Sequence, residues 1–222
     1  MRHVVITGTT RGLGEALVDQ ILATADTRIL ALARDFTTRQ KADPRITTRP
    51  CDLSEPATLP DAAEFAGFLQ TAAVGVLVNN AAVVEPVGAI GSLSSDQLAR
   101  AVTVNLTAPL LLTNAFLAGQ PAGQAARVLF VSTGAAHRVI QNWAAYSATK
   151  RGAEEFFTHL AAERPDVTVA IINPGVIDTG MQETLRRSDF PEHQRFVDRY
   201  EQGELRPARD VAAEIVAQHL PE

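Results

Sequence analysis

Short runs of apolar residues, separated by longer amphipathic stretches, recur along this chain. All of the runs except the one at 46–49 lack the alternation of a half-exposed strand, so they predict parallel strands that are buried on both faces of a sheet. The stretches between them have helical spacing, which predicts an α/β fold: a doubly wound (Rossmann) parallel sheet with helices on both faces. The predicted strands are His3–Thr7, Arg28–Ala33, Ile46–Arg49, Val74–Asn79, Arg127–Ser132 and Val167–Asn173. The predicted helices are Gly14–Ala23, Ala57–Gln70, Ser95–Ala118, Ala144–Glu163 and Ala208–Leu220.

The sequence also marks the starts of two helices and a polar stretch near its C-terminal end. Ser54, before Glu55-Pro56, and Ser94, before Ser95-Asp96, supply oxygen atoms that cap the N–H groups of a first helical turn. Charged residues crowd the stretch from about 179 to 206, which we interpret as a mobile lid over a substrate pocket. Residues 1–222 are expected to form one domain.

The composition narrows the classes of function. A chain of 222 residues that is 46% hydrophobic can form one sizeable core, and its net charge of -5 argues against nucleic acid or an anionic membrane as partner. A small-molecule substrate fits better. The lone Cys51 predicts neither a disulfide nor a metal site and favours a reducing, cytoplasmic location. The first strand starts close to Met1, so we expect no signal peptide, and we expect no apolar stretch of membrane-spanning length.

A glycine-rich turn follows the first predicted strand and opens the first predicted helix. Its sequence is Thr7-Gly8-Thr9-Thr10-Arg11-Gly12-Leu13-Gly14. Glycines let the backbone approach a pyrophosphate, and the start of a helix is positively polarised toward that anion. Such a turn by itself is as often a tight structural bend. Between a strand and a helix, it predicts dinucleotide binding.

The end of the second predicted strand bears on which dinucleotide is bound. No carboxylate stands where an NAD-specific protein would grip both ribose hydroxyls, and Arg34 is suited to receive a 2′-phosphate. Arg11 adds a second cation aimed at the same phosphate, although either residue alone is more often a solvated surface arginine. Asp35, one residue further on, favours NAD. The balance favours NADPH.

Two further strand ends border the crevice where an adenosine would lie. The third strand is followed by Cys51-Asp52-Leu53, and the fourth ends in Asn79-Asn80-Ala81-Ala82. Both segments also have the chemistry of ordinary turns. For Asp52 a cofactor contact and a simple helix cap are equally good interpretations.

The segment Tyr146-Ser147-Ala148-Thr149-Lys150 places a phenol and an ammonium on one face of a helix. A phenol with its ordinary pKa of about 10 is a poor proton carrier near neutrality, and a neighbouring ammonium lowers that pKa by favouring the phenolate. Without the upstream glycine turn, an exposed surface pair would be the simpler interpretation. With it, Tyr146 is predicted to be the catalytic acid and Lys150 its electrostatic partner.

These motifs together resemble the short-chain dehydrogenase/reductase family over nearly the whole chain. Finer features, among them Trp143 and Asp178-Thr179-Gly180-Met181-Gln182, are similar to the branch that contains sepiapterin reductases and bacterial benzil reductases. The motifs that carry the resemblance are Gly8–Gly14, Asn79-Asn80-Ala81-Ala82, Asn105, Ser132-Thr133, Tyr146 with Lys150, and Pro174-Gly175-Val176-Ile177-Asp178-Thr179.

The resemblance implies a role for each matching residue. Tyr146 would protonate the carbonyl oxygen, and Lys150 would bind the hydroxyls of the nicotinamide ribose. Asn105 would hold a water in the proton relay, although a structural hydrogen bond in a helix bend explains this residue equally simply. Thr179, beyond Pro174-Gly175-Val176-Ile177, would contact the nicotinamide carboxamide.

A hydroxyl at Ser132 or Thr133 would bind the substrate oxygen, where charge develops as hydride arrives. In relatives of this kind the catalytic hydroxyl lies thirteen positions before the tyrosine, which here is Thr133. Successive side chains of a strand point to opposite faces, so only one of the two hydroxyls is expected to face the substrate. We favour Thr133.

Two positions depart from the pattern of the family. The usual Asn-Ala-Gly is Asn80-Ala81-Ala82, which should narrow the crevice slightly and still admit the cofactor. The chain stops at Leu220-Pro221-Glu222, where relatives run on into a seventh strand. We therefore expect a sheet that lacks this strand and part of the pocket wall.

The function expected from these residues is NADPH-dependent reduction of a ketone or diketone. The alternatives are a dinucleotide sensor without catalytic activity and an NAD-dependent alcohol dehydrogenase. The apolar helices Ser95–Ala118 and Ala144–Glu163 suggest a homodimer, unless the sheet alone covers them. Candidates for an apolar pocket, or equally for the core, are Val84, Val139, Ile140, Trp143 and Met181.

Overall fold

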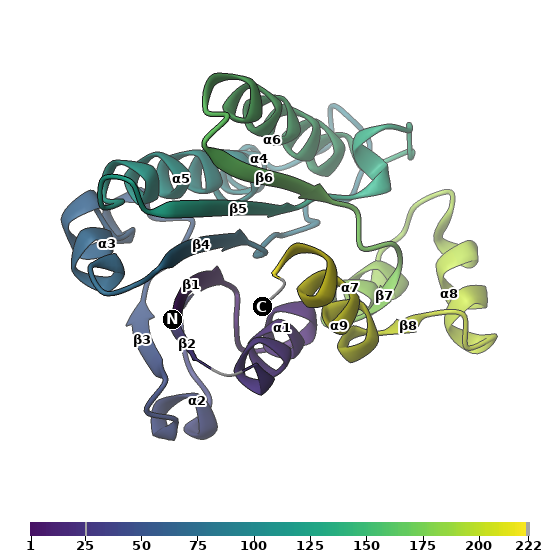
Figure 1. Ribbon diagram of the computed structural model, residues 1–222. Coiled ribbons are helices and arrows are strands. Elements are labelled where there is room, and N and C mark those ends of the chain that lie inside the picture. Colours follow the sequence, from purple (N-terminus) through teal and green to yellow (C-terminus); the bar gives the residue numbers. More distant parts are fainter. Residues whose placement is uncertain (25, 221–222) are drawn as a thin grey trace.

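A parallel sheet of six strands forms the middle layer of the molecule, in the spatial order β3-β2-β1-β4-β5-β6 (Figure 1). The computed structural model describes residues 1–24 and 26–220. The strand order reverses between β1 and β4, and in open parallel sheets this reversal opens a crevice at the carboxyl ends of the strands. The strands are β1 Arg2–Thr7, β2 Thr27–Ala33, β3 Ile46–Pro50, β4 Val74–Asn79, β5 Ala125–Val131 and β6 Val167–Ile172.

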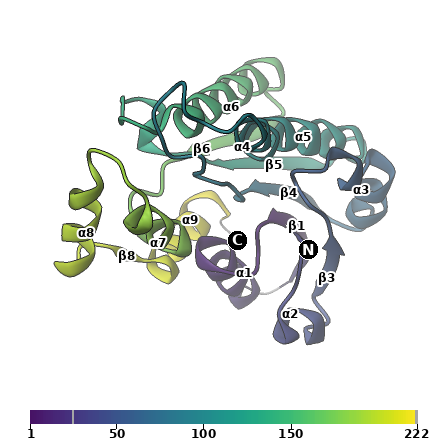
Figure 2. The same cartoon turned by 180° about the vertical axis from the view of Figure 1, so that it is seen from behind.

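Helices cover both faces of this sheet, as Figures 1 and 2 show from opposite sides. One layer contains α3, α4, α5 and α6, and the other contains α1 and α9. The helices are α1 Gly12–Ala23, α2 Thr38–Ala42, α3 Ala62–Leu69, α4 Ser95–Val102, α5 Ala108–Ala118, α6 Ala144–Glu163, α7 Gly180–Arg187, α8 His193–Glu201 and α9 Ala208–His219.

The inner strands are largely apolar because both of their faces are covered, whereas the edge strand β3 has no buried residue. In β1, Val4 and Ile6 point into the core beneath α1 and α9, whereas Val5 points into the opposite core with Phe65 and Phe116. A strand that is buried on both faces has no polar face to alternate with the apolar one. The prediction of a doubly wound sheet with helices on both faces is confirmed.

The segment predicted as the helix Ala57–Gln70 is the clearest local error. It divides into a short 3-10 turn, Pro56–Thr58, and the helix α3. Asp61 caps α3 by accepting a hydrogen bond from the backbone N–H of Glu64, so the predicted cap at Ser54 is wrong. The predicted cap at Ser94 is confirmed, because its side chain accepts from the N–H of Gln97.

The long predicted helix Ser95–Ala118 is continuous, with a π-helical turn at Thr103–Thr107 joining α4 to α5. Its 24 residues reach the length and mean hydropathy of a membrane span, so the expectation of no such stretch is wrong. Leu112 and Phe116, however, lie fully buried in the core between α5 and the sheet. A core helix of this kind meets the same criteria, so the finding is weak support for a membrane segment.

The segment expected to be a lid extends beyond the carboxyl ends of β4–β6 (Figure 1). It contains α7, α8 and an unpredicted two-stranded ribbon, β7 Ile177–Asp178 with β8 Arg206–Pro207. Leu185, Phe190 and Phe196 are buried against one another and their neighbours, so the segment has an apolar core despite its polar composition.

The sheet ends at β6 among the described residues, without the seventh strand of the resembled family. Ile171 lies on β6, the edge strand, and its side chain is 40% exposed. Pro221 and Glu222, on which the expected absence of the strand partly rested, lie outside the described residues.

Candidate active site

A cavity of about 590 Å³ occupies the carboxyl edge of the sheet, where the strand order reverses. Its volume lies within the range of about 300–1,000 Å³ that is usual for cofactor and ligand pockets. The walls come from the turns after β1, β2, β4 and β5, from α6, and from the segment that follows β6. Predicted site residues from distant parts of the sequence thus meet at one place.

The glycine turn after β1 forms one end of this cavity and leaves no room for side chains. A Cβ atom on Gly14 would lie 2.0 Å from the carbonyl oxygen of Gly8, and one on Gly8 would lie 2.9 Å from the Cβ of Ala81. Arg11, at the N-cap position of α1, makes no side-chain capping bond. The first N–H groups of α1 are therefore available to an anion such as a pyrophosphate.

Asn80 and Thr7 lock the glycine turn to the end of β4. The Asn80 side-chain amide donates to the carbonyl of Thr7 at 2.9 Å. The Thr7 hydroxyl accepts from the backbone N–H groups of Asn80 and Ala81, each at 3.0 Å. Sequence reasoning missed Thr7, whose only signal is a polar residue at the end of an apolar strand.

Asp52 lines the cavity but does not cap a helix, since the N-cap residues of the next two helical segments are Glu55 and Asp61. Its carboxylate lines the cavity and also accepts from the N–H and the hydroxyl of Ser54, at 2.9 and 2.7 Å. These two hydrogen bonds, assisted by the charges of Arg34 and Arg100, lower the pKa of Asp52 below its ordinary value. Arg100, on α4, is a cation of this cavity that the sequence analysis did not identify.

The two arginines expected at the cofactor phosphate occupy different surroundings. Arg34 lies on the cavity wall at the end of β2, beside Asp35 and close enough to Asp52 to act on its charge. The guanidinium of Arg11 lies against Gly180, since a Cβ on that glycine would be 3.2 Å from Nη1. Among the residues that the structure describes, neither arginine forms an ion pair.

The segment after β6 closes the cavity beside the glycine turn. Thr179 lies against Gly12, because a Cβ there would be 3.2 Å from the Thr179 methyl group, and its side chain does not cap α7. Other predicted cofactor residues line the same cavity, namely Thr10, Leu13, Leu53, Ala81, Ala82, Pro174, Gly175, Val176 and Ile177.

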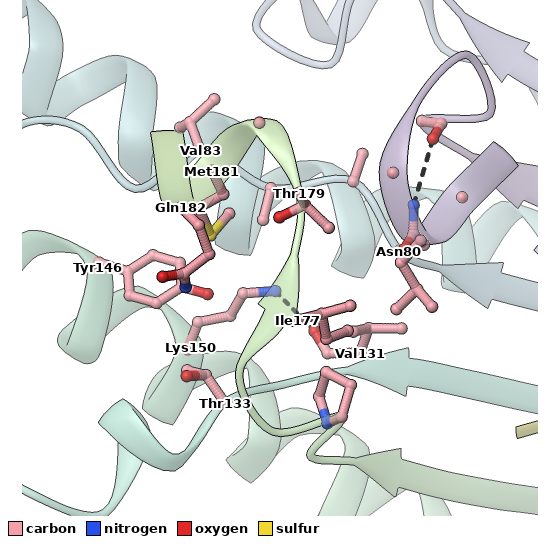
Figure 3. A pocket seen from close by; sticks show the side chains of 18 of the residues that line it. Asn80, Val83, Val131, Thr133, Tyr146, Lys150, Ile177, Thr179, Met181 and Gln182 are labelled. Carbon is pink, nitrogen blue, oxygen red and sulfur yellow. Dashed lines mark hydrogen bonds between the residues drawn. The ribbon is translucent and has the colours of Figure 1, made fainter. Parts of the chain in front are cut away.

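Lys150 is fully buried and ties α6 to the end of β5 (Figure 3). Its ammonium donates to the carbonyl of Val131 at 2.7 Å and lies 4.6 Å from the centre of the Phe130 ring. Burial lowers the pKa of Lys150 to about 7, while the charge of Glu154 acts in the opposite direction. Near neutral pH the side chain of Lys150 is therefore present in both its charged and its neutral form.

Tyr146 lies one helical turn before Lys150 on the cavity wall. Burial raises the pKa of Tyr146 to about 12, and a hydrogen bond with the Thr133 side chain opposes this rise only in part. The expected lowering of this pKa by Lys150 is therefore wrong in this structure, because desolvation of the phenol dominates and the lysine ammonium bonds to Val131.

The structure separates the two candidate hydroxyls after β5. Thr133 lies in the cavity beside Tyr146 (Figure 3), and its hydroxyl also accepts from the N–H of Ala135 at 3.2 Å. Ser132 is buried, and its hydroxyl donates to the carboxylate of Glu154. Ser132 also borders the cavity, but its hydroxyl is bonded to Glu154. Thr133 therefore provides the hydroxyl beside Tyr146, as expected from the alternation of side chains along a strand.

The side chain of Asn105 is bonded to other groups of the protein. Its side-chain oxygen accepts from the N–H of Val83 at 2.8 Å, and its amide donates to the Val83 carbonyl at 2.7 Å and to Thr149 at 3.2 Å. The side chain is fully buried and does not line the cavity. Its position in the π-helical turn fits the structural alternative, a hydrogen bond in a helix bend.

An aromatic cluster forms the apolar wall near Tyr146. The Trp143 ring lies 5.9 Å from the ring of Tyr146 and 5.3 Å from that of Phe196 on α8. Ile140 and Met181 also line the cavity, whereas Val84 packs in the core behind it. The expectation for Val139 is wrong, because its side chain is 93% exposed.

Comparisons with known proteins agree with this geometry. A family model described as short chain dehydrogenase matches residues 2–189. A benzil reductase ((S)-benzoin forming) of Bacillus cereus is 32% identical over 97% of this chain and 92% of its own length.

Solved structures give the same result. The crystal structure of the KRED1-Pglu enzyme has a TM-score of 0.89 and 31% identity, and the match covers 100% of this chain and 95% of that one. A putative NAD(P) dependent gluconate 5-dehydrogenase from Beutenbergia cavernae, with bound NADP at low occupancy, has a TM-score of 0.80 and 26% identity. That match covers 97% of this chain and 88% of the other.

The burial of Lys150 predicts a specific dependence of stability on pH. Its pKa is about 7 in the folded protein and 10.5 as the ordinary value, so the unfolded state binds more protons between these limits. The free energy of unfolding should therefore rise with pH above 7, by at most about 1.4 kcal/mol per pH unit from this residue. Denaturant unfolding of the protein without cofactor, from pH 7 to 8.5, measures this slope.

Lys150→Met should flatten the slope, and Lys41→Met, at an exposed lysine, should retain it. The window stops at 8.5 because burial raises the pKa of Cys51 from 9.0 to about 11, which adds an opposite slope at higher pH. Parallel curves for the original protein and Lys150→Met would contradict the assigned burial effect.

Proposed function

Because this chain belongs to the short-chain dehydrogenase family, we propose that it is an NADPH-dependent reductase that converts a ketone or diketone to an alcohol. The observation that carries this proposal is the convergence of Tyr146, Lys150 and Thr133 at one end of a cavity whose other end is the glycine turn. Similarity to a benzil reductase supports a diketone as one substrate class.

The cavity fits a dinucleotide at its glycine end. The close approach of Gly14 to Gly8 leaves the backbone bare, and the uncapped start of α1 offers N–H groups to a pyrophosphate. Arg11 and Arg34, joined by Arg100, would supply positive charge for a 2′-phosphate. Bound NADPH would supply the hydride.

Tyr146 would supply the proton. With a pKa of about 12 the phenol is protonated near neutral pH, which is the form required to reduce a carbonyl. The oxygen of a reduced carbonyl is far more basic than a phenolate, so the transfer is favourable. Thr133, beside the phenol, would donate a hydrogen bond to the same oxygen while negative charge develops there.

Lys150 and Thr179 would hold the nicotinamide end of the cofactor. The lysine ammonium has donors beyond the one used on Val131, and these would serve the ribose hydroxyls. The Thr179 hydroxyl, free of any capping bond, would serve the carboxamide. Trp143, Ile140 and Met181 would then form the apolar contact surface for the substrate.

Turnover of a panel of ketones and diketones, followed by loss of NADPH absorbance, tests the proposal directly. Tyr146→Phe should lower kcat by at least about a hundredfold and leave NADPH affinity nearly unchanged, because it removes only the transferable proton. Tyr200→Phe, at the exposed second tyrosine, is the matched control. NADPH binding without turnover of any carbonyl would instead favour a dinucleotide sensor.

The preference for NADPH over NADH should be at least about tenfold in dissociation constant, equivalent to about 1.4 kcal/mol. Arg34→Ala should weaken NADPH binding several-fold and leave NADH binding almost unchanged, since only NADPH carries the 2′-phosphate. Calorimetric titration with each cofactor measures both constants. Equal affinities in the original protein would refute the preference and would favour the NAD-dependent alternative.

We also propose that the protein acts in the cytoplasm.

We further propose that the protein is a homodimer, built by α4–α5 and α6 packing against their copies. Val102 and Leu111 support this interface, because they are 43% and 45% exposed on the apolar helices. Val102→Glu with Leu111→Glu should therefore yield a monomer in light scattering at micromolar concentration, with its helical content unchanged. A monomer before substitution would contradict the dimer, and no tetramer through a seventh strand is expected.

A further inference from the structure

The catalytic scheme above leaves one buried carboxylate without a function. Glu154 lies on α6, one turn after Lys150 and two turns after Tyr146. It is 8% exposed, in a position where an unpaired charge would be costly. A buried carboxylate on the catalytic face of a helix requires partners, and the structure provides them.

Each oxygen of Glu154 contacts the segment that follows β5, one through a hydrogen bond and the other at ion-pair distance. The Ser132 hydroxyl donates to Oε1, and Nε2 of His137 lies 2.8 Å from Oε2. Arg151 donates to Nδ1 of His137 at 2.8 Å. Since an arginine can only donate, Nδ1 accepts, and the ring proton of a neutral His137 lies on Nε2, the nitrogen that faces Glu154.

These two contacts enclose Thr133. Ser132 precedes it, and His137 follows the 3-10 turn Gly134–Ala136 that Thr133 caps through the N–H of Ala135. Glu154 thus fastens both ends of the 132–137 segment to the helix that carries Tyr146. The carbonyl of Val131, just before this segment, is held by Lys150 from the same helix face.

We infer that Glu154 is a positioning residue, whose contacts with Ser132 and His137 fix the Thr133 hydroxyl beside the Tyr146 phenol. This inference rests on the proposed carbonyl reductase activity and assigns the residue that orders its hydrogen-bonding group. Such groups must be held to within about 0.5 Å for full activity. The bond from the Ala135 N–H lies within the 132–137 segment, so the segment itself must also be held in place. The charge of Glu154 also acts on Lys150, where it counters the effect of burial on the pKa.

Glu154→Gln tests the inference with the least change of shape. Glutamine keeps one acceptor oxygen but presents an NH₂ group where the second carboxylate oxygen stood, so it cannot accept from both Ser132 and His137. We expect kcat to fall about tenfold and the KM values for NADPH and ketone to change less than about twofold, because Thr133 acts on charge that develops during the reaction.

Glu155→Gln is the matched control, since its side chain is 69% exposed on the same helix and, among the residues that the structure describes, pairs only with His159. It should retain the original kcat. His137→Ala, at a half-exposed side chain, removes one of the two contacts and should lower kcat about threefold. This variant decides the question if Glu154→Gln does not fold.

A double-mutant cycle separates positioning from a general loss of stability. Thr133→Val should lower kcat about a hundredfold, as expected for one lost donor to a developing oxyanion. Adding Glu154→Gln to Thr133→Val should then cost less than about threefold, because the group that Glu154 positions is already absent. A further full tenfold loss would overturn the inference.

Hydrogen exchange gives a readout that is independent of turnover. The N–H groups of Ala136 and His137 bond to the carbonyls of Thr133 and Gly134. Their exchange should accelerate in Glu154→Gln and stay unchanged in Glu155→Gln. Unchanged exchange, or faster exchange with normal kcat, would overturn the inference. If the original protein reduces no carbonyl, the proposed function fails, and the exchange data alone decide whether Glu154 holds the segment.

Discussion

The buried hydrogen bond from the Lys150 ammonium to the Val131 carbonyl is the constraint on which the chemical end of the cavity depends. A buried ammonium is costly unless a strong acceptor meets it, so α6 is fixed along its axis relative to the end of β5. Residues that lie one or two turns apart on the same face of α6 then contact the segment that follows β5. Tyr146 meets Thr133, and Glu154 meets Ser132 and His137.

Burial has opposite effects on the pKa values of the two central groups, and both effects favour the neutral form. The pKa of Tyr146 rises to about 12 and that of Lys150 falls to about 7. The phenol is consequently protonated at neutral pH, which is the form that the proposed reduction requires. Positive charge on the lysine is held by the Val131 carbonyl and by the nearby carboxylate of Glu154.

The two ends of the cavity are built by different means. Backbone groups dominate the glycine end, where the Thr7 hydroxyl and the Asn80 amide lock the turn to β4. Side chains dominate the chemical end, and the aromatic contact of Trp143 with Phe196 connects it to α8. The segment after Thr179 therefore serves as a wall with its own apolar contacts, although its composition alone suggested only a polar lid.

Local sequence determined the elements and the chemistry of this protein. Apolar runs without alternation specified strands buried on both faces, and the glycine turn, Arg34 and the Tyr146–Lys150 pair identified both ends of the site. Tertiary structure decided which polar atoms meet. The partners of Asn105 and Glu154 come from segments 22 residues away, so no local pattern shows that Asn105 binds the Val83 backbone or that Glu154 holds Ser132. Desolvation likewise depends on the completed core, which is why the pKa of Tyr146 rises where the spacing to Lys150 predicted that it would fall.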